Sequence, residues 1–298
     1  MTDDLSALLT GLTPTPAKVE AYRTDTYVLE TVDQLRESGV DATEFARRHA
    51  MLLLKPDAIV ARAVEPTLEW LGANGFPVVG AYRVPVDRHL ARALWYFAWN
   101  IASPERRRLA DLLVGISDAL VLLVRGEDGR IPVSVRLTEA KGPTDPRKRR
   151  PEHLRYVLGR HSYLLNLVHS PDDPADVLRE FAIYFDERTR TGILAADHGS
   201  DAVAHAARLA KDLYASTPER GFDRADALAR LRSDTGAAGG TWSDDDCARL
   251  LYDAWARDID IDPWSAIVLG SHVLPMRTGT QSQTLRPVTV NDWLEGRP

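Results

Sequence analysis

A histidine stands between an apolar strand pattern and an amphipathic helix pattern, and this junction constrains the fold more than any other stretch of the chain. Residues 163–168 are mostly apolar and predict a short strand, while residues 174–185 carry apolar side chains at helical spacing. Asp173 and Pro174 mark the helix start, because aspartate caps a helix N-terminus and proline fits its first position. His169 is therefore expected at a strand-to-helix junction.

Glu180 falls on the flank of the apolar stripe of this predicted helix. From there a carboxylate can reach back to the imidazole and fix its tautomer, as a chemically active histidine requires. A lone histidine before a helix is usually structural, so the pair alone does not define a site.

Further strand and helix patterns surround this junction. Apolar runs predict strands at residues 51–54, 76–84, 120–125 and 131–137. Helical spacing of apolar residues predicts helices at residues 31–37, 42–49, 65–74, 88–115, 202–214, 224–231 and 244–256. This order of elements is compatible with an α+β fold built on a ferredoxin-like βαββαβ sheet.

The composition indicates a soluble protein with a substantial core. The chain has 298 residues, of which 44% are hydrophobic and 27% charged, a length typical of one or two domains. Its single cysteine, Cys247, excludes an internal disulfide framework and a cysteine-based metal cage. No apolar run is long enough to span a membrane and the start lacks a basic signal-peptide region, so we expect a cytoplasmic protein without a membrane partner.

Positive charge gathers in residues 136–160, although the whole chain has a net charge of −6. Eight Lys or Arg stand there against three acidic residues, a net of +5. A protein that binds nucleic acid usually has a basic face overall. A local positive field in an acidic protein therefore favours the binding of a small polyanion such as a triphosphate. The run of four basic residues at 147–150 is by default a solvated surface loop.

Five short motifs, in order and at near-regular spacing, resemble the nucleoside diphosphate kinase family over about residues 49–188. The first is Lys55-Pro56-Asp57 after an apolar strand, and the second is the turn 142–146, which is similar to the family's Gly-x-Thr-Asn-Pro. Arg155 follows Thr144 by eleven residues, as the second arginine of the family does.

The remaining two motifs involve the histidine itself. Asn166, three residues before His169, matches the family's asparagine and phosphorylated histidine. Glu180, eleven residues after His169, matches the carboxylate that orients the ring. The resemblance implies the ferredoxin-like antiparallel sheet core and an ATP-dependent transfer of the γ-phosphoryl group, through a phosphohistidine at His169, to a nucleoside diphosphate or related acceptor.

The resemblance also implies roles for other side chains, which fit the need of phosphoryl transfer for cations and hydrogen-bond donors around the transferring oxygens. Lys55, Arg136 and Arg155 are expected to supply cations, Thr144 a hydroxyl, and Asn166 an amide to the ribose or a phosphate. Mg²⁺ is expected to come with the nucleotide phosphates, so that no metal site of the protein's own is needed.

Several departures from the family pattern leave alternatives open. The chain has Ser170-Pro171 after the histidine where most members have Gly-Ser, and the Arg136–Thr144 spacing is about two residues longer than usual. The aromatic clamp for the base is not cleanly placed, although Tyr96, Phe97 or Trp99 could serve. One alternative is a phosphotransferase that acts on a specialised metabolite. Another is a catalytically silent nucleotide-binding or scaffold module.

A second histidine must be weighed against His169. The sequence His198-Gly199-Ser200-Asp201 copies the family's usual motif at its core. It has alanine, not asparagine, three residues before the histidine and leucine, not glutamate, eleven after it. We therefore favour His169 as the phosphorylated residue.

The resemblance covers only half of the chain, which we divide into three parts. These are a helical N-terminal extension at residues 1–48, a nucleoside diphosphate kinase-like domain at 49–190, and a mostly helical region of unknown role at 191–298. The last part is expected to end in a proline-punctuated tail with few regular elements. Because basic residues fill the loop that usually builds larger family assemblies, we expect a homodimer.

Overall fold

A four-stranded antiparallel sheet forms the centre of the computed structural model, which describes residues 2–159, 161–196 and 201–296. The strands are β1 (His49–Leu54), β2 (Val78–Val84), β3 (Ala119–Arg125) and β4 (Val168–His169), in the order β2-β3-β1-β4. Leu54 pairs with Leu120 of β3 on one side of β1, and Leu53 pairs with His169 of β4 on the other. The expected α+β fold with a ferredoxin-like sheet is confirmed.

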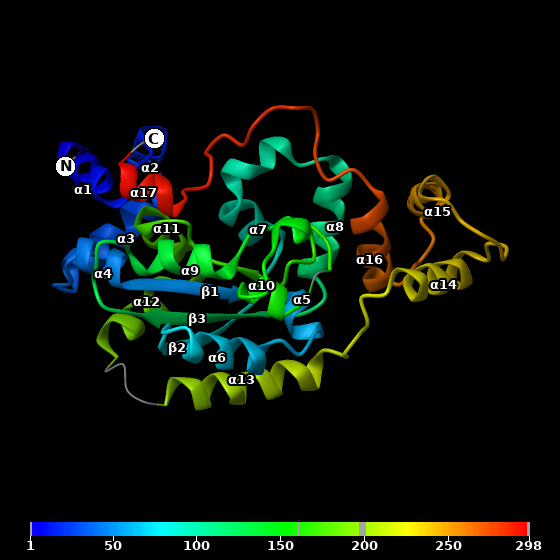
Figure 1. Cartoon of the computed structure of the whole chain (residues 1–298), viewed down its shortest axis with the longest axis horizontal. Helices are drawn as coiled ribbons and strands as arrows, with labels where there is room; N and C mark the ends of the chain where they lie inside the picture. The colour runs from blue at the N-terminus through cyan, green and yellow to red at the C-terminus, as the bar shows by residue number, and fades with distance from the viewer. Residues whose placement is uncertain (1, 160, 197–200, 297–298) are drawn as a thin grey trace.

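Helices cover both faces of the sheet, because alternate residues of a strand point to opposite faces. On one face Met51 and Leu53 pack with residues of α3 (Thr26–Glu37) and α11 (Pro174–Tyr184). On the other face Leu52 and Leu54 pack with α6 (Val64–Ala73) and α13 (Ala202–Ser216). Figure 1 shows the sheet between these two helical layers.

The remaining helices are distributed around this core. Those before β1 are α1 (Thr2–Leu12), α2 (Pro16–Tyr22) and α4 (Ala42–Arg48). Those between β1 and α11 are α5 (Pro56–Val60), α7 (Arg88–Leu94), the 3₁₀ helix η1 (Tyr96–Ile101), α8 (Pro104–Val114), α9 (Val133–Lys141), the 3₁₀ helix η2 (Pro146–Lys148) and α10 (Leu154–Val157). Those after α11 are α12 (Glu187–Ala195), α14 (Arg224–Thr235), α15 (Asp244–Ala256), α16 (Pro263–Val273) and α17 (Val290–Glu295). No helix in these described ranges is long and apolar enough to cross a membrane.

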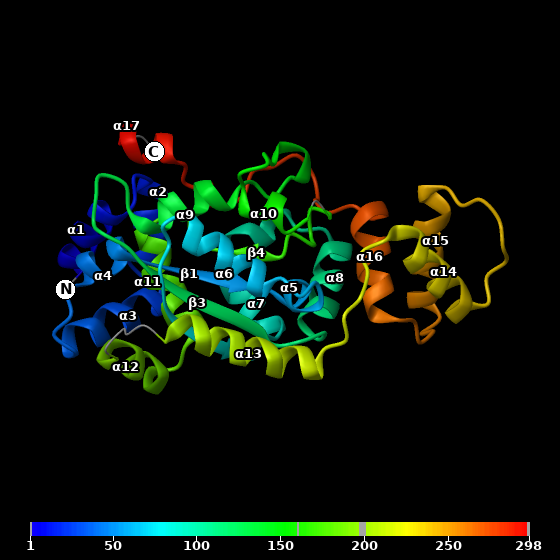
Figure 2. The ribbon, with the colours of Figure 1, turned by 60° about the horizontal axis from the view of Figure 1, so that its bottom comes forward.

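The C-terminal helices form a separate cluster beyond α8. Leu109 and Leu113 of α8 pack with Trp264 and Ile267 of α16, and α14 and α15 close the same apolar cluster. Figure 2 shows α14, α15 and α16 together at one end of the molecule. From α16 the chain returns across the molecule to α17, which lies beside α9.

Three predictions about secondary structure were wrong. Residues 131–137 form no strand, since Pro132 precedes helix α9, and this helix supplies the second α of the βαββαβ order. The strand expected at 163–168 is reduced to Val168–His169, because Leu167 has a left-handed φ of 65°. The tail contains α16, a buried helix whose nearly uniform apolar sequence shows little periodicity.

Candidate functional site

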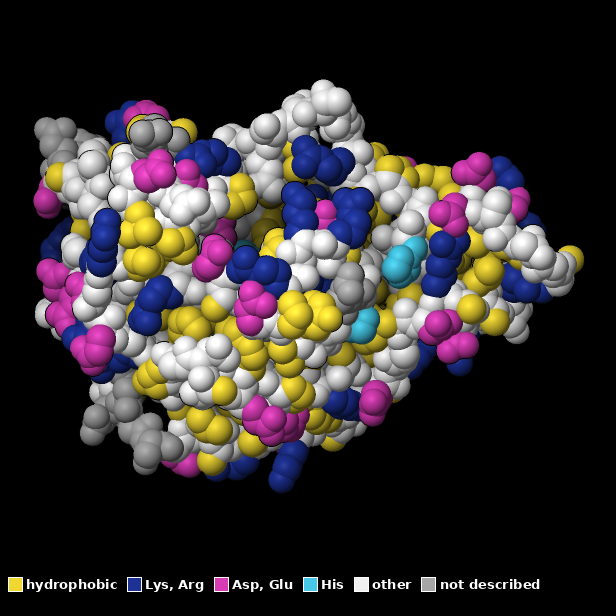
Figure 3. All heavy atoms as spheres, in the orientation of Figure 1, with side chains coloured by type: hydrophobic (Ala, Val, Ile, Leu, Met, Phe, Trp, Pro, Cys, Tyr) yellow, Lys and Arg dark blue, Asp and Glu magenta, His cyan; other side chains and the backbone are white. Residues whose placement is uncertain are grey.

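A cavity of about 640 Å³, which we call the main cavity, opens between α7 and α8, α9, the loop before α10, and the C-terminal segment. Its walls include His169, Lys55, Arg155, Thr144 and Asn166, which are five of the side chains that the sequence predicts for one site. Lys and Arg side chains gather beside a hollow over α10 and the loop that precedes it (Figure 3).

His169 ends strand β4 and is held by helix α11. Its Nε2–H donates to Glu180 Oε1 at 2.9 Å, and the other carboxylate oxygen of Glu180 accepts from the Tyr184 hydroxyl at 3.1 Å. The Trp95 ring packs edge-on against the imidazole, with ring centroids 5.5 Å apart. Because a carboxylate only accepts hydrogen bonds, this contact places the proton of a neutral imidazole on Nε2 and leaves the lone pair on Nδ1.

Two buried cations stand in the wall of the same cavity. Lys55 Nζ donates to the carbonyl of Leu164 at 3.0 Å and lies 3.3 Å from the carboxylate of Asp57. Arg155 donates to the carbonyl oxygens of Gly142 at 2.9 Å and Val168 at 2.6 Å. Burial lowers the pKa of Lys55, and burial together with nearby Arg149 lowers the pKa of Arg155 to about 9. An anion in the cavity would relieve both effects.

Thr144 and Asn166 reach the cavity from loops that Arg155 holds together. The guanidinium lies 3.3 Å from Thr144 Oγ1 and 3.5 Å from Asn166 Oδ1. The first loop begins at Gly142, which has a left-handed φ of 85° and packs so closely on His153 that a Cβ would lie 2.5 Å from the ring. Glycine at this position therefore allows the turn that brings Thr144 to the cavity.

Arg136 does not lie in this cavity, which corrects its placement in the predicted site. Its guanidinium stacks over Phe76, and its side chain lines a different cavity together with Arg48 and Arg125. Thr138 lines the main cavity instead. Residues two apart on a helix are turned about 200° from each other, so Thr138 and Arg136 point in opposite directions from α9.

The basic run at residues 147–150 is only partly a solvated loop. Arg147 is exposed and pairs with Asp145, whereas Arg149 is 6% exposed and donates to backbone carbonyls such as Thr144 O. Lys148 and Arg150 line the cavity. Part of this run therefore shapes the loop and adds positive charge to the cavity rim.

Sequence reasoning missed several parts of the cavity wall. Trp95, Lys141 and the C-terminal residues 287–290 line it, and no family motif points to them. Of the three aromatic candidates for a base clamp, Trp99 lines the cavity, whereas Tyr96 is 64% exposed and does not. His198, the other histidine considered, lies outside the described residues.

Comparisons with known proteins agree with these motifs. The family model for nucleoside diphosphate kinase matches residues 48–190. A nucleoside diphosphate kinase of Mycolicibacterium vanbaalenii is 31% identical over 139 residues, which cover 46% of this chain and 96% of that protein. The enzyme of Thermococcus kodakarensis is 28% identical over 137 residues, covering 45% and 75% respectively. The solved structure of the Aquifex aeolicus nucleoside diphosphate kinase aligns with 47% of this chain and 95% of its own, at 22% identity and a TM-score of 0.40.

The family model and the two sequence relatives support a domain of the transferase class. The chain belongs to the nucleoside diphosphate kinase family. About half of its length lies outside the matched domain, and part of that remainder lines the cavity.

Proposed function

We propose that the protein is an ATP-dependent phosphotransferase that carries the γ-phosphoryl group on His169 and passes it to a nucleoside diphosphate. The observation that carries this proposal is the His169–Glu180 contact of 2.9 Å at the wall of a cavity that also contains buried Lys55 and Arg155. The family membership supports the same chemistry.

In the first half-reaction the lone pair of His169 Nδ1 attacks the γ-phosphorus. A P–N bond forms, the bond to the β,γ-bridging oxygen breaks, and the nucleoside diphosphate leaves with that electron pair. Glu180 holds the ring through Nε2, while Lys55 and Arg155 stabilise the charge on the transferring oxygens. In the second half-reaction a terminal oxygen of the acceptor attacks the phosphorus, and the P–N bond returns its electrons to the imidazole.

The metal is proposed to enter as part of the substrate, Mg·ATP. Among the residues that the structure describes, no group of three or more His, Cys, Asp or Glu side chains is arranged to hold a metal ion. Mg²⁺ is commonly bound through substrate phosphates and water, so this arrangement is compatible with a nucleotide-borne ion.

The deciding experiment is incubation of the full chain with Mg·ATP labelled at the γ-phosphate. We expect a protein-bound phosphoryl group that is acid-labile and base-stable, and that is released by nucleoside diphosphates. Nucleotide binding with neither labelling nor transfer would instead identify a silent nucleotide-binding module.

A second candidate differs in the acceptor, and the C-terminal segment favours it. Pro287 and Val288 line the cavity, and the segment is anchored near its other wall by the Thr284 N–H, which donates to Phe97 O at 3.0 Å. This segment lies outside the matched family domain and adds the apolar side chains of Pro287 and Val288 to the cavity wall. A screen of the labelled protein against nucleoside diphosphates and phosphorylated metabolites separates the two candidates.

Replacement of Glu180 by glutamine should slow phosphohistidine formation while leaving nucleotide affinity almost unchanged. The carboxylate orients the ring and does not itself line the main cavity. Loss of this orientation is expected to lower the rate of phosphohistidine formation on the order of 10²-fold. Rapid-quench labelling measures the rate, and titration with a non-hydrolysable ATP analogue measures the affinity. Asn166→Ala is the contrasting variant, since it should weaken binding. If Glu180→Gln is labelled at the wild-type rate, Glu180 does not take part in the mechanism.

Replacement of Arg155 by methionine should slow labelling on the order of 10²-fold, as expected for the loss of a cation aimed at the transferring group. Arg136→Met should change the rate far less, because Arg136 lines another cavity. Arg155→Lys, which keeps a charge, should lie between wild type and Arg155→Met. Equal effects at both arginines would show that Arg136 moves into the site when nucleotide binds.

A further inference from the structure

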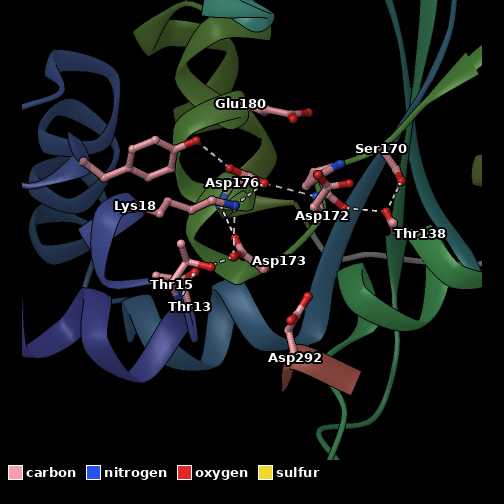
Figure 4. Close-up of polar contacts among 12 residues, drawn as sticks. Thr13, Thr15, Lys18, Thr138, Ser170, Asp172, Asp173, Asp176, Glu180 and Asp292 are labelled. Carbon is pink, nitrogen blue, oxygen red and sulfur yellow. Dashed lines mark hydrogen bonds and ion pairs between the residues drawn. The ribbon is translucent and has the colours of Figure 1, made fainter. Parts of the chain in front are cut away.

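Lys141 is a buried amine beside the reacting histidine, and no motif of the family assigns it a role here. It stands at the end of α9, lines the main cavity and is 4% exposed. Its Nζ lies 2.7 Å from Ser170 Oγ and 3.3 Å from both Ser170 O and Thr138 Oγ1. Thr138 Oγ1 in turn lies 2.7 Å from Ser170 Oγ and donates to Pro171 O at 2.8 Å (Figure 4). The amine therefore anchors the turn that directly follows His169.

These contacts suit an ammonium group. Three oxygen atoms surround Nζ, and an ammonium has three N–H donors and no acceptor. All three oxygens are neutral, and among the described residues Lys141 forms no ion pair with a carboxylate. The charged form is thus hydrogen-bonded but not neutralised, which is unfavourable for a buried cation.

Charged groups of three neighbouring elements act on this amine. Arg155 of α10 disfavours the ammonium, whereas Asp172 of the turn after β4, and Asp176 and Glu180 of α11, favour it less strongly. Burial is the largest effect and, with Arg155, lowers the pKa of Lys141 to about 7. The amine therefore gives up its proton far more readily than an exposed lysine does.

A phosphate chain that enters the cavity would change this balance. The proposed substrate must bring its γ-phosphoryl group to His169, which directly precedes Ser170, and must pass Arg155 in the same cavity. Negative charge at that place compensates Arg155 and favours the protonated amine.

We propose that Lys141 is a positioning residue that takes up one proton from solvent when the phosphate chain of the nucleotide binds, and that its ammonium then holds the His169–Ser170 turn for transfer. This inference rests on the proposed function, because it needs a phosphate chain in the cavity. It adds a proton-linked step, in which substrate binding itself generates a positive charge next to the reacting histidine. In this step a proton from the solvent buffer forms an N–H bond with the lone pair of Nζ, and no other bond is made or broken in the protein.

The test is calorimetric titration of Mg²⁺ and a non-hydrolysable ATP analogue at pH 8, in buffers of different ionisation enthalpy. The wild type should take up close to one proton for each analogue bound. Lys141→Met should take up far less than one proton and bind more weakly, and Lys141→Arg, whose guanidinium is far more basic than an amine, should also take up far less but keep its affinity. Lys211→Met is the matched control, because Lys211 is exposed on α13, and it should behave as wild type.

A pH series provides the second readout. Between pH 7.5 and 9.5, wild-type affinity should fall by up to about tenfold per pH unit, because binding requires a protonated amine that becomes rarer above its pKa of about 7. Lys141→Arg should show a clearly weaker pH dependence over this range, and what remains comes from Arg155, whose pKa is about 9, and from Lys55, whose pKa burial also lowers. A merely structural role would leave the profile unchanged in the variant.

The outcomes separate this inference from the proposed function. Proton uptake by Lys141→Arg or Lys141→Met equal to that of wild type would overturn the role of Lys141, even if His169 is labelled normally. The wild type could instead bind the analogue with Lys141-dependent proton uptake but form no phosphohistidine from ATP. That result would overturn the proposed phosphoryl transfer and support the proposed protonation of Lys141. Absence of analogue binding would overturn both.

Discussion

His169→Ala is expected to abolish labelling of the protein by Mg·ATP, with a loss on the order of 10³-fold or more, because the attacking nitrogen of the proposed mechanism is removed. Affinity for a non-hydrolysable ATP analogue should remain within a few fold of wild type, since Lys55, Thr144 and Arg155 stay in the cavity wall. Filter-bound label after base treatment measures the first quantity, and titration of the analogue measures the second.

His198→Ala is the matched control for this variant. The sequence around His198 copies the usual family motif, yet it lacks both the asparagine before and the glutamate after the histidine. We expect full labelling of His198→Ala. If labelling is lost in His198→Ala and kept in His169→Ala, the contact between His169 and Glu180 is structural and the proposed mechanism is wrong.

The local part of the site could be predicted because strand, turn and helix lie next to one another in the sequence. Residues 169 and 180 are joined by a tight turn and two turns of helix α11, so their spacing alone brings the imidazole and carboxylate to 2.9 Å. The spacing of Thr144 and Arg155 similarly leads to a contact of 3.3 Å across one loop. In both cases few residues intervene, and the connecting geometry is regular.

The position of Arg136 outside the main cavity could not be predicted from the spacing of the motifs. The sequence is about two residues longer than usual between this arginine and Thr144, and the arginine lies on helix α9. A shift of two residues on a helix rotates a side chain by about 200° and places it on the opposite face. The alternating apolar residues at 131–135 also predicted a strand there, so the helical rotation of the side chains was not expected.

Contacts between distant parts of the chain could not be predicted from local patterns. Pro287 and Val288 line the cavity more than a hundred residues after His169, and nothing in their own sequence indicates that position. Helix α16 is buried on nearly all sides, so its apolar residues show no amphipathic stripe, although Asp262 and Pro263 carry a recognisable helix start. Tertiary packing determines both features.

The first 48 residues were predicted only as a helical extension, and the structure ties them to helix α11 through a buried charge cluster. Lys18 Nζ of α2 lies 3.0 Å from Asp173 Oδ2 and 2.8 Å from Asp176 Oδ2, at the start of α11 (Figure 4). Thr13 Oγ1 donates to Asp173 at 2.6 Å, and the Tyr22 hydroxyl donates to Asp176 at 2.5 Å. The same helix carries Glu180, so the N-terminal extension helps to fix the carboxylate that holds His169.

Lys18→Met should therefore lower the free energy of unfolding by about 3–5 kcal/mol, the range measured when one partner of a buried ion pair is removed. Lys18 is 3% exposed, and its loss leaves the buried carboxylates of Asp173 and Asp176 without their cation. Urea unfolding followed by tryptophan fluorescence measures the change. Lys211→Met, on the exposed face of α13, should leave the midpoint unchanged.

The pH dependence of the stability lost in Lys18→Met distinguishes the removal of a charge from a packing defect. Burial already raises the pKa of Asp173 to about 6 in the folded wild type, while Lys18 opposes that rise. Without Lys18 the folded-state pKa of Asp173 rises further above its unfolded value, and the pKa of Asp176, which Lys18 helps to hold below its ordinary value, rises as well. The folded variant therefore binds protons that the unfolded chain does not. Its stability must then increase as the pH falls from 8 towards 5, and the difference from wild type must shrink. A difference that stays constant across this range would mean that Lys18 contributes through packing of its hydrocarbon chain, and that the charge cluster does not hold α11.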